Sequence, residues 1–535
     1  MASKLLSALL NYQGQDSAHP YTLLIGIGVI FAIALIVRLR NPLNSIPGPF
    51  WARWTPFWLT YYASNGNMHR KMIETHKRYG SLVRTGPNEI SVSNPQALKV
   101  IYGQQIPPVV VIPVPTLNWD CAKFFEARIG AGNNFRKSDW YSVWQGVRKW
   151  DLFGERNEEI HRAQRKLVSQ IYSLSNMKKL EPYVNSAVSV FVEKLATQSH
   201  APIHMNKWTQ LFAFDVIGEI TFSKRFGFME SGNDDGAFSM IENSLRSAAW
   251  VGYVPWVYWT NLRLSPIIGS HLAVTARQGR LLAFAAKAIA ERKERGSEHE
   301  DILSQFFSVQ QEKPEFNDMS ITSMVASNIF AGSDSTGASI SSLLFYVCKN
   351  PDSKKQLVDE IDAVAKAQNI QRGEVFSLET ANGMPYLQAC MWEALRCFPA
   401  VGMNLGRVVP PSGVEIDGQY IPGGTVVGAN AWVVHQDKKT FGEDADKFRP
   451  ERWMEDSERV GDMKRGFFSF GGGSRLCIGR NIGWLEMSKV VPTLLHTFDM
   501  ELPDPDLELI EHAWSFVKIE NFRVTLKPRG KLAAN

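Results

Sequence analysis

The chain has 535 residues, of which 44% are hydrophobic and 21% charged, so its composition is globular and its length suffices for a large core. Its 58 basic and 53 acidic residues leave a formal charge of +5, a mild excess that does not indicate a nucleic-acid-binding protein. The five cysteines are odd in number and scattered, which argues against a disulfide framework and favours a cytosolic main body.

An uncharged run of 17 residues, Tyr21 to Val37, stands near the N-terminus. As a helix it would span roughly 25 Å, close to a bilayer core of about 30 Å. Arg38 and Arg40 follow it, whereas Lys4 is the only basic residue before it. The positive-inside bias therefore places the rest of the chain in the cytosol.

We expect a short lumenal segment at 1–20, a transmembrane anchor helix at 21–37, and a basic, proline-rich joint at 38–50. A cleaved signal peptide is the alternative, but the basic region before the run is weak and no small-x-small cleavage site follows it.

The remaining residues, 51–535, contain no repeat and no domain linker, and they predict one mainly α-helical domain with small β-sheets. "MHRKMIETHKRYG" (68–80) indicates a helix stopped by glycine, and residues 81–94 indicate two short strands. Helical patterns dominate from about 160 to 400. Strands return at 412–434, with turns at Asp417-Gly418 and at Pro422 to Gly424 that predict hairpins.

One long predicted helix, from about 320 to 350, carries the unusual stretch "IFAGSDSTGAS". Glycine within a helix costs about 1 kcal/mol relative to alanine, and serine, aspartate and threonine are poor helix formers. The stretch can be a solvated polar face. It can also be a local distortion where Gly332 leaves room for a ligand and the hydroxyls of Ser335 and Thr336 bind water beside Asp334.

A glutamate–arginine pair follows on the helical stretch "PYLQACMWEALRCFP", where Glu393 and Arg396 share one helix face. Alone, such a pair is usually an exposed ion pair that contributes little to stability.

"FSFGGGSRLCIGR" joins three glycines, Arg475 and Cys477 just before a helix that starts at or just after the cysteine. Free backbone N–H groups and the helix dipole favour a thiolate there. The loop lacks the Lys-Ser or Lys-Thr of a phosphate loop and the neighbouring ligands of a zinc site. A nucleophilic cysteine stays possible, although no nearby residue supplies a base.

The pattern FxxGxRxCxG from Phe470 to Gly479 resembles the haem-binding loop of the cytochrome P450 family. The resemblance covers roughly residues 45–530 and implies a single P450-type domain behind the transmembrane helix. It also implies a haem b cofactor whose iron takes Cys477 as its proximal thiolate ligand.

Further residues take roles from the same resemblance. Arg475, Arg407 and Arg165 would bind the haem propionates, with His161 at a position where the family usually has Trp. Taken singly, each could equally be a surface residue.

Glu393 and Arg396 resemble the family's ExxR element, and Arg452 in "FRPERW" would join them to brace the loop under the haem. Asp334 and Ser335 resemble its acid–alcohol pair, with Thr336 as a possible substitute for the serine. Such a pair relays protons to oxygen.

The implied function is a haem-thiolate monooxygenase that inserts one oxygen atom of O2 into a lipophilic small molecule. Electrons would come from an NADPH–cytochrome P450 reductase docking near Arg480, Lys464 and Arg465, with the enzyme single-pass in the endoplasmic reticulum membrane. Two alternatives stay open, a haem-thiolate isomerase or dehydratase that does not use O2 and a non-catalytic haem binder.

By family position the substrate pocket would draw on residues 105–135, on Phe330 and Ala331, on 400–404 and on 514–516, which are largely apolar. The local sequences "AGSDST" and "FSFGGGSRLCIGRNI" are similar to those of filamentous-fungal enzymes of secondary metabolism, above all the pisatin-demethylase-like branch. Terpenoid, alkaloid and polyketide substrates all fit.

Overall fold

The computed structural model describes residues 39–103, 135–198, 201–269 and 271–530, with a few isolated positions between 25 and 38. It divides into an N-terminal unit, Met1–Pro47, and a large unit, Gly48–Asn535. The N-terminal unit contains the short helix η1 (Pro42–Ser45), capped by Asn41. No helix among the described residues is long and apolar enough to cross a bilayer. The expected lumenal segment lies outside those residues, and the expected anchor at 21–37 lies mostly outside them.

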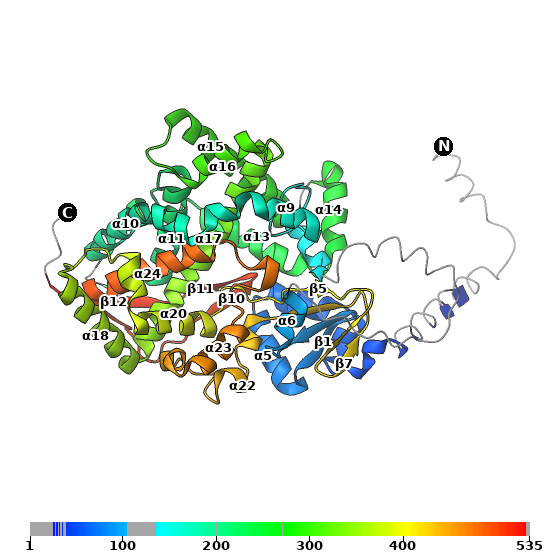
Figure 1. The fold of residues 1–535 in the computed structure, drawn as a ribbon. Coiled ribbons are helices and arrows are strands. Elements are labelled where there is room, and N and C mark those ends of the chain that lie inside the picture. The colour runs from blue at the N-terminus through cyan, green and yellow to red at the C-terminus, as the bar shows by residue number, and fades with distance from the viewer. Residues whose placement is uncertain are drawn as a thin grey trace. The chain divides into compact units, whose positions relative to one another are not determined.

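Helices make up most of the large unit (Figure 1). Its first part contains α3 (Phe50–Trp54), α4 (Phe57–Ser64), α5 (Met68–Tyr79), α6 (Ala97–Tyr102), η2 (Asp139–Tyr141), α8 (Ser142–Gln145), α9 (Glu158–Val168), η3 (Ser169–Tyr172), α10 (Leu174–Thr197), α11 (Met205–Phe222), α12 (Phe228–Ser231), α13 (Ala237–Val251) and α14 (Pro255–Ile268). Its second part contains α15 (Ala273–Arg295), α16 (Ile302–Glu312), α17 (Asp318–Lys349), α18 (Pro351–Gln368), α19 (Leu378–Asn382), α20 (Pro385–Cys397), α21 (Ala431–Val434), α22 (Lys438–Phe441), η4 (Pro450–Met454), α23 (Ser457–Gly466), η5 (Gly473–Arg475) and α24 (Arg480–Thr497).

Four small sheets accompany these helices. The strands are β1 (Leu82–Gly86), β2 (Glu89–Val92), β3 (Arg136–Lys137), β4 (Ile203–His204), β5 (Arg407–Val408), β6 (Val414–Ile416), β7 (Gln419–Ile421), β8 (Val426–Ala429), β9 (Phe498–Glu501), β10 (Glu511–Trp514), β11 (Phe516–Ile519) and β12 (Arg523–Pro528). The largest sheet has the order β1-β2-β8-β5-β3, and the others are β4-β12-β9, β6-β7 and β10-β11. The expectation of a mainly helical fold with small sheets is confirmed.

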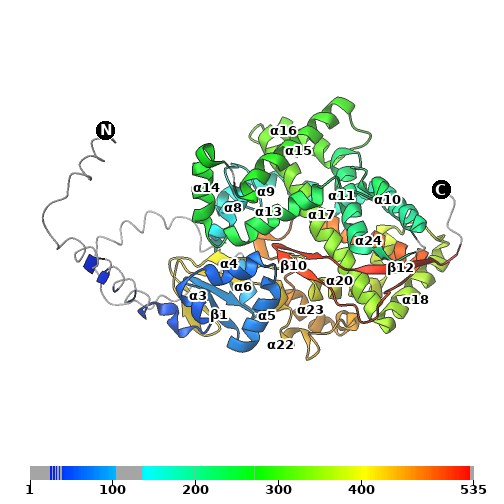
Figure 2. The same cartoon turned by 180° about the vertical axis from the view of Figure 1, so that it is seen from behind.

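The five-stranded sheet lies at one end of the large unit beside α5, and the long helices α10, α11, α17 and α24 gather toward the other (Figures 1 and 2). Helix α17 runs through the middle. Of its 32 residues, 19 are buried, so it is a core helix with neighbours all round rather than a surface helix with one wet face. The alternative of a solvated polar face over "IFAGSDSTGAS" is therefore wrong for most of that stretch.

The hairpin expectations are confirmed with one correction. β1 pairs with β2 in antiparallel register, and the turn between β6 and β7 places Asp417 and Gly418 at positive φ. The strand pattern at 412–434 ends early, because residues 431–434 form the helical turn α21. The Asn430 side chain accepts a hydrogen bond from the Trp432 amide and caps that turn, which is the function asparagine commonly has at a helix start.

Candidate active site

Cys477 lies between η5 and α24, ahead of the first turn of α24, in a segment at 468–479 that we call the cysteine loop. The helix begins at Arg480, so the cysteine stands three residues before it rather than at its first position. The Cys477 amide donates to the Phe470 carbonyl at 2.9 Å, and the backbone amides of Gly479 and Arg480 hydrogen-bond to its sulfur. These amides are the orphan donors expected at a helix start.

The side chain of Cys477 is exposed although protein surrounds it, so it faces an internal opening. Burial raises the pKa of the thiol, against the two amide hydrogen bonds and the charge of Arg165. The thiolate that the sequence predicts therefore needs a further positive partner at the sulfur. A metal ion is such a partner, because a coordinating thiol loses its proton outright.

The glycines of the loop have a packing function as well as a conformational one. Gly471 and Gly473 adopt positive φ values of 71° and 62°. A Cβ on Gly473 would lie 1.6 Å from the Tyr102 carbonyl oxygen at the end of α6, which no side chain could tolerate. The loop is thus held against α6 at its tightest point.

A cavity of about 740 Å³ opens beside this loop. Its polar lining is strongly cationic and comes from α9, β5 and the cysteine loop. The lining residues include His161, Arg162, Arg165, Lys166, Arg407 and Arg475, with Glu158 as the acid among them. Four of the five cofactor-binding residues predicted from the sequence therefore meet at one cavity, and the fifth, Cys477, directly follows its lining residue Leu476.

Two of the arginines that line the cavity, Arg475 and Arg407, are held in place by contacts with neighbouring side chains and backbone. Arg475, nearly buried, pairs with Glu158 at 2.7 Å and donates to the Glu155 carbonyl at 2.8 Å. Arg407 donates to the Tyr141 hydroxyl at 3.3 Å and lies over the ring of Tyr102. Guanidinium groups held in this way are preorganised for carboxylates.

His161 is buried among these cations, and its protonation state follows from that. Burial lowers its pKa to about 2, and the charge of Arg475 acts in the same direction. His161 is thus neutral at physiological pH and can offer one N–H donor. Burial and the charge of Arg407 likewise lower the pKa of Lys137, whose ammonium lies over the ring of Tyr141.

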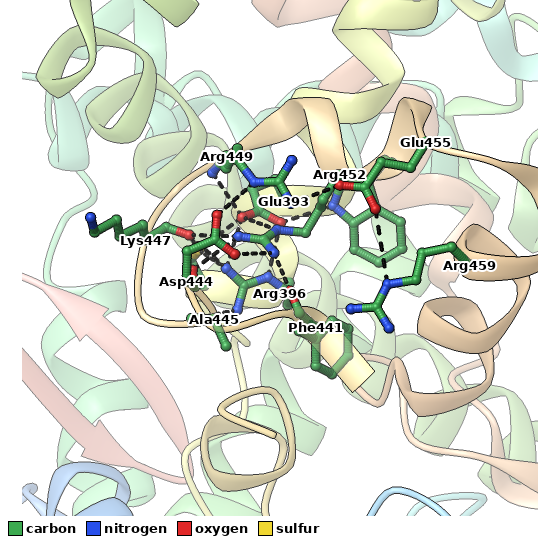
Figure 3. A network of polar contacts seen from close by, with 12 residues as sticks. Glu393, Arg396, Phe441, Asp444, Ala445, Lys447, Arg449, Arg452, Glu455 and Arg459 are labelled. Atoms are coloured by element: carbon green, nitrogen blue, oxygen red, sulfur yellow. Dashed lines mark hydrogen bonds and ion pairs between the residues drawn. The ribbon is translucent and has the colours of Figure 1, made fainter. Parts of the chain in front are cut away.

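The predicted brace is fully formed (Figure 3). Glu393 binds Arg396 at 2.8 Å and Arg452 at 3.0 Å, and all three side chains are 0% exposed. Trp453 and the Arg449 amide add hydrogen bonds of 2.9 Å to the same carboxylate. Burial alone would raise the pKa of Glu393, but the two guanidinium groups and these donors keep it lowered. The alternative of a surface pair is wrong.

The brace is tied to the cysteine loop through His435. Its Nδ1 lies 2.9 Å from the Arg396 carbonyl, and its Nε2 accepts from the Phe468 amide at 2.9 Å. The Ser469 hydroxyl donates to the Leu395 carbonyl at 2.6 Å, which gives a second link. Because an N–H acceptor must be unprotonated, His435 is neutral, and burial lowers its pKa to about 3.

The glycines of α17 serve a different purpose from the one expected. The helix is unbroken from Asp318 to Lys349. A Cβ on Gly332 would lie 2.5 Å from Ile217 Cδ1, and one on Gly337 would lie 2.9 Å from Gln210 Cα. The expectation that Gly332 makes a distortion with room for a ligand is therefore wrong. Both glycines instead let α11 pack closely against α17.

The acid and the alcohols of this stretch point in different directions. The Asp334 carboxylate accepts a hydrogen bond from the Gln210 side chain on α11. The Ser335 hydroxyl donates to the Ala331 carbonyl at 2.6 Å. Thr336 is buried, and its Oγ1 faces the first turn of α24, 3.5 Å from where a Cβ on Gly483 would stand. Burial raises the pKa of Asp334 to about 6, against the bond from Gln210.

Three of the four expected pocket segments converge, whereas most of 105–135 lies outside the described residues. The Gly402 amide donates to the Ser515 carbonyl at 3.0 Å, and the Phe330 and Phe516 rings are 5.7 Å apart. Asn404 is buried, and neither polar atom of its side chain has a hydrogen-bond partner among the described residues. The segments expected to form the substrate pocket thus bring together apolar and aromatic side chains, with the Asn404 amide as the polar exception.

Several residues here were missed by sequence reasoning. Glu158, Tyr141, His435 and Gln210 all make the contacts described above. Their letters carry no motif, because each acts through a partner far away in the chain. His435 follows four apolar residues in "AWVVHQD", which could have marked it as buried.

The residues fit an iron porphyrin, since the accessible Cys477 sulfur directly follows a lining residue of a cavity edged by cations suited to two propionates. Such a site defines a haem-thiolate protein. Comparison with known proteins agrees, because the family model for cytochrome P450 matches residues 133–525. The chain belongs to the cytochrome P450 family, whose members use haem iron with a cysteine thiolate ligand.

Curated relatives narrow the class further. The chain is 37% identical to the cytochrome P450 monooxygenase hepC of Aspergillus oryzae over 87% of this chain and 88% of that one. It is 35% identical to the cytochrome P450 monooxygenase cicH of Emericella nidulans, over 92% and 95%. It is 34% identical to the pisatin demethylase of Fusarium vanettenii, over 91% and 89%. The chain is thus a P450 monooxygenase similar to these fungal enzymes.

Proposed function

We propose that Cys477 is the proximal iron ligand, and that Arg165, Arg407, Arg475 and His161 hold the haem at its carboxylate edge. The haem, when bound, supplies the redox chemistry by which one oxygen atom of O2 enters the substrate and the other leaves as water. The observation that carries this proposal is the Cys477 sulfur, which receives two backbone amides and opens inward beside the cationic cavity.

In this proposal Asp334 and Ser335 move protons, with Thr336 able to replace the serine. A carboxyl with a pKa near 6 is matched to accepting and giving a proton near neutral pH.

Removing the hydroxyls should let NADPH consumption continue while product falls. Ser335→Ala alone should be mild, and the double change Ser335→Ala with Thr336→Val should lower product per NADPH severely, on the scale of about 10²–10⁴-fold for acid–base steps. An unchanged ratio in the double variant contradicts the relay.

The proposed substrate is a lipophilic, medium-sized molecule of secondary metabolism. Phe330, Phe516 and the 400–404 segment support this with an apolar wall, in which Asn404 is the polar exception. Metabolite analysis after deletion or transplantation of the gene identifies the substrate. Turnover without NADPH or O2 would instead move the protein to the isomerase class.

We also propose that Tyr21–Val37 anchors the protein in the endoplasmic reticulum membrane with its catalytic domain cytosolic. Exposed aromatic side chains support a membrane-facing surface. Phe50, Trp51 and Tyr61 on α3 and α4 are 60–67% exposed, and such rings favour the membrane interface.

Removal of residues 1–40 should release much of the protein to the soluble fraction with its haem retained. A mature chain that begins after residue 37 would indicate a signal peptide instead.

Electrons are proposed to arrive from an NADPH–cytochrome P450 reductase. Arg480, Lys464 and Arg465 support this, because all three are exposed on the side of the cysteine loop and α23. Arg480→Glu should raise the reductase concentration needed for half-maximal reduction. It should also weaken the salt dependence of that reduction, since rim charges act mainly on association. Unchanged reduction kinetics would remove Arg480 from the docking surface.

A further inference from the structure

The tip of the β10–β11 hairpin, which lies beside α17, has an unusual backbone conformation (Figure 1). The two strands pair as far as Trp514 and Phe516, so Ser515 alone forms the turn. Ser515 has a φ of 79°, in the left-handed region that glycine adopts freely and that costs a serine free energy. Tight turns through a single residue at such a φ are rare and strained.

Contacts with the chain that follows α20 hold the tip in this conformation. The Gly402 amide donates to the Ser515 carbonyl at 3.0 Å. The Val517 amide donates to the Ala400 carbonyl at 2.8 Å. A Cβ on Gly402 would lie 2.5 Å from the Ala513 Cβ, so glycine is needed there for the two segments to come this close. The strain at Ser515 is thus imposed by its neighbours.

These contacts do not explain why residue 515 is a serine. Glycine would relieve the strain and keep both hydrogen bonds, because they join main-chain atoms. What serine adds is a hydroxyl, and the Ser515 Oγ is buried without a hydrogen-bond partner among the described residues. A buried polar group in that state costs free energy as well. Strain and an unpaired hydroxyl at one residue indicate that a ligand uses the hydroxyl.

The surroundings of the tip indicate what that ligand is. The ring of Phe516, the next residue, lies 5.7 Å from the ring of Phe330 on α17. Both segments that meet at the tip belong to the lipophilic pocket of the proposed function. In apolar surroundings a hydroxyl proton needs an acceptor, and a bound substrate can supply one.

We propose that the Ser515 hydroxyl donates a hydrogen bond to an oxygen atom of the substrate, which makes Ser515 a specificity-determining residue. The inference rests on the proposed function and narrows its substrate to a lipophilic molecule that already carries an acceptor oxygen, such as a carbonyl or an ether. A bare hydrocarbon would leave the hydroxyl unpaired. The reaction that supplies the substrate must therefore deliver an oxygenated scaffold.

The hydrogen bond is tested with two probes, 1-tetralone and tetralin, which differ in a single carbonyl group. Their Kd values are measured on the ferric, haem-loaded full chain by the shift of its Soret absorption band. The ratio of the two Kd values is compared between variants, because the difference in lipophilicity then cancels. Ser515→Ala keeps the strain and removes the hydroxyl, and it should shift the ratio about five- to tenfold against 1-tetralone, the scale of one hydrogen bond.

Asn404→Leu is the matched control for this measurement. It removes another pocket side chain whose polar atoms lack partners among the described residues, and it should leave the ratio unchanged. A ratio that stays the same in Ser515→Ala, or that shifts only in Asn404→Leu, would overturn the proposal.

The strain is tested by the thermal midpoint of the same protein without a probe. Ser515→Gly should raise the midpoint by about 1 °C and shift the Kd ratio as Ser515→Ala does. A gain in stability with a loss of selectivity is not expected of a residue that is only structural. An unchanged or lower midpoint in Ser515→Gly would overturn the argument from strain and the proposal with it.

Asn369→Gly is the control for the strain. Asn369 has a φ of 57° at the exposed end of α18, and asparagine tolerates this conformation. The substitution should leave the Kd ratio unchanged and the midpoint nearly so.

The outcomes separate this inference from the proposed function. If both probes shift the Soret band but the ratio does not respond to Ser515, the lipophilic pocket stands and the function of Ser515 is rejected. If neither probe shifts the band, the lipophilic pocket itself is rejected, and the function of Ser515 with it.

Discussion

Arg452 and Glu393 are 59 residues apart in the chain, yet their side chains meet at 3.0 Å with neither exposed to solvent. Arg452 pairs with both Glu393 and Asp444, so its removal leaves the two carboxylates of this network short of one cation, although Arg396 still binds Glu393. Arg452→Leu should therefore destabilise the protein by about 3–5 kcal/mol. Urea unfolding followed by circular dichroism measures this loss.

The matched control is Lys438→Leu, which breaks the exposed pair with Glu443. We expect no measurable change in its urea midpoint, because exposed pairs contribute little. If Arg452→Leu unfolded at the same urea concentration as this control, the brace would have no structural role.

His435 predicts a pH dependence of stability. Its pKa is lowered from 6.5 to about 3 in the folded state, so between these values the unfolded chain binds the extra proton. Stability therefore rises with pH across this window and gains nothing further above 6.5 from this group. His435→Gln should flatten the rise by up to about 1.4 kcal/mol per pH unit. Parallel slopes for both proteins in urea titrations at pH 4.5–6.5 would count against a buried, neutral His435.

Glycine-to-alanine substitutions in two helices distinguish the effect of tight packing on stability from the effect of helix propensity. Gly337→Ala in α17 places a methyl 2.9 Å from the Gln210 backbone on α11, and we expect a loss of about 1–3 kcal/mol from overpacking. Gly279→Ala in α15 meets no atom within 4 Å and should gain up to about 1 kcal/mol. Thermal unfolding of both variants gives the comparison. A gain in both would mean that α11 and α17 are not held at this spacing.

Most of the features that the sequence predicted correctly depend on residues close together in the chain. The turn at Asp417-Gly418, the glycine after α5 and the cysteine loop each depend on residues a few positions apart, so the sequence showed them directly. The function of Gly332 could not be read in this way, because the atom that it accommodates belongs to Ile217 on another helix. The ion pair between Arg475 and Glu158 joins residues 317 positions apart, and only the fold brings them together.

The central claim is that Cys477 provides the thiolate ligand of the haem, and the absorption spectrum of the ferrous–CO complex tests it most directly. Cys348→Ala, whose thiol faces the Met500 carbonyl, is the matched control and should keep the thiolate spectrum of the unaltered protein. Cys477→Ala should lose that spectrum entirely even where haem is still bound. A thiolate spectrum that persisted in Cys477→Ala would contradict the account.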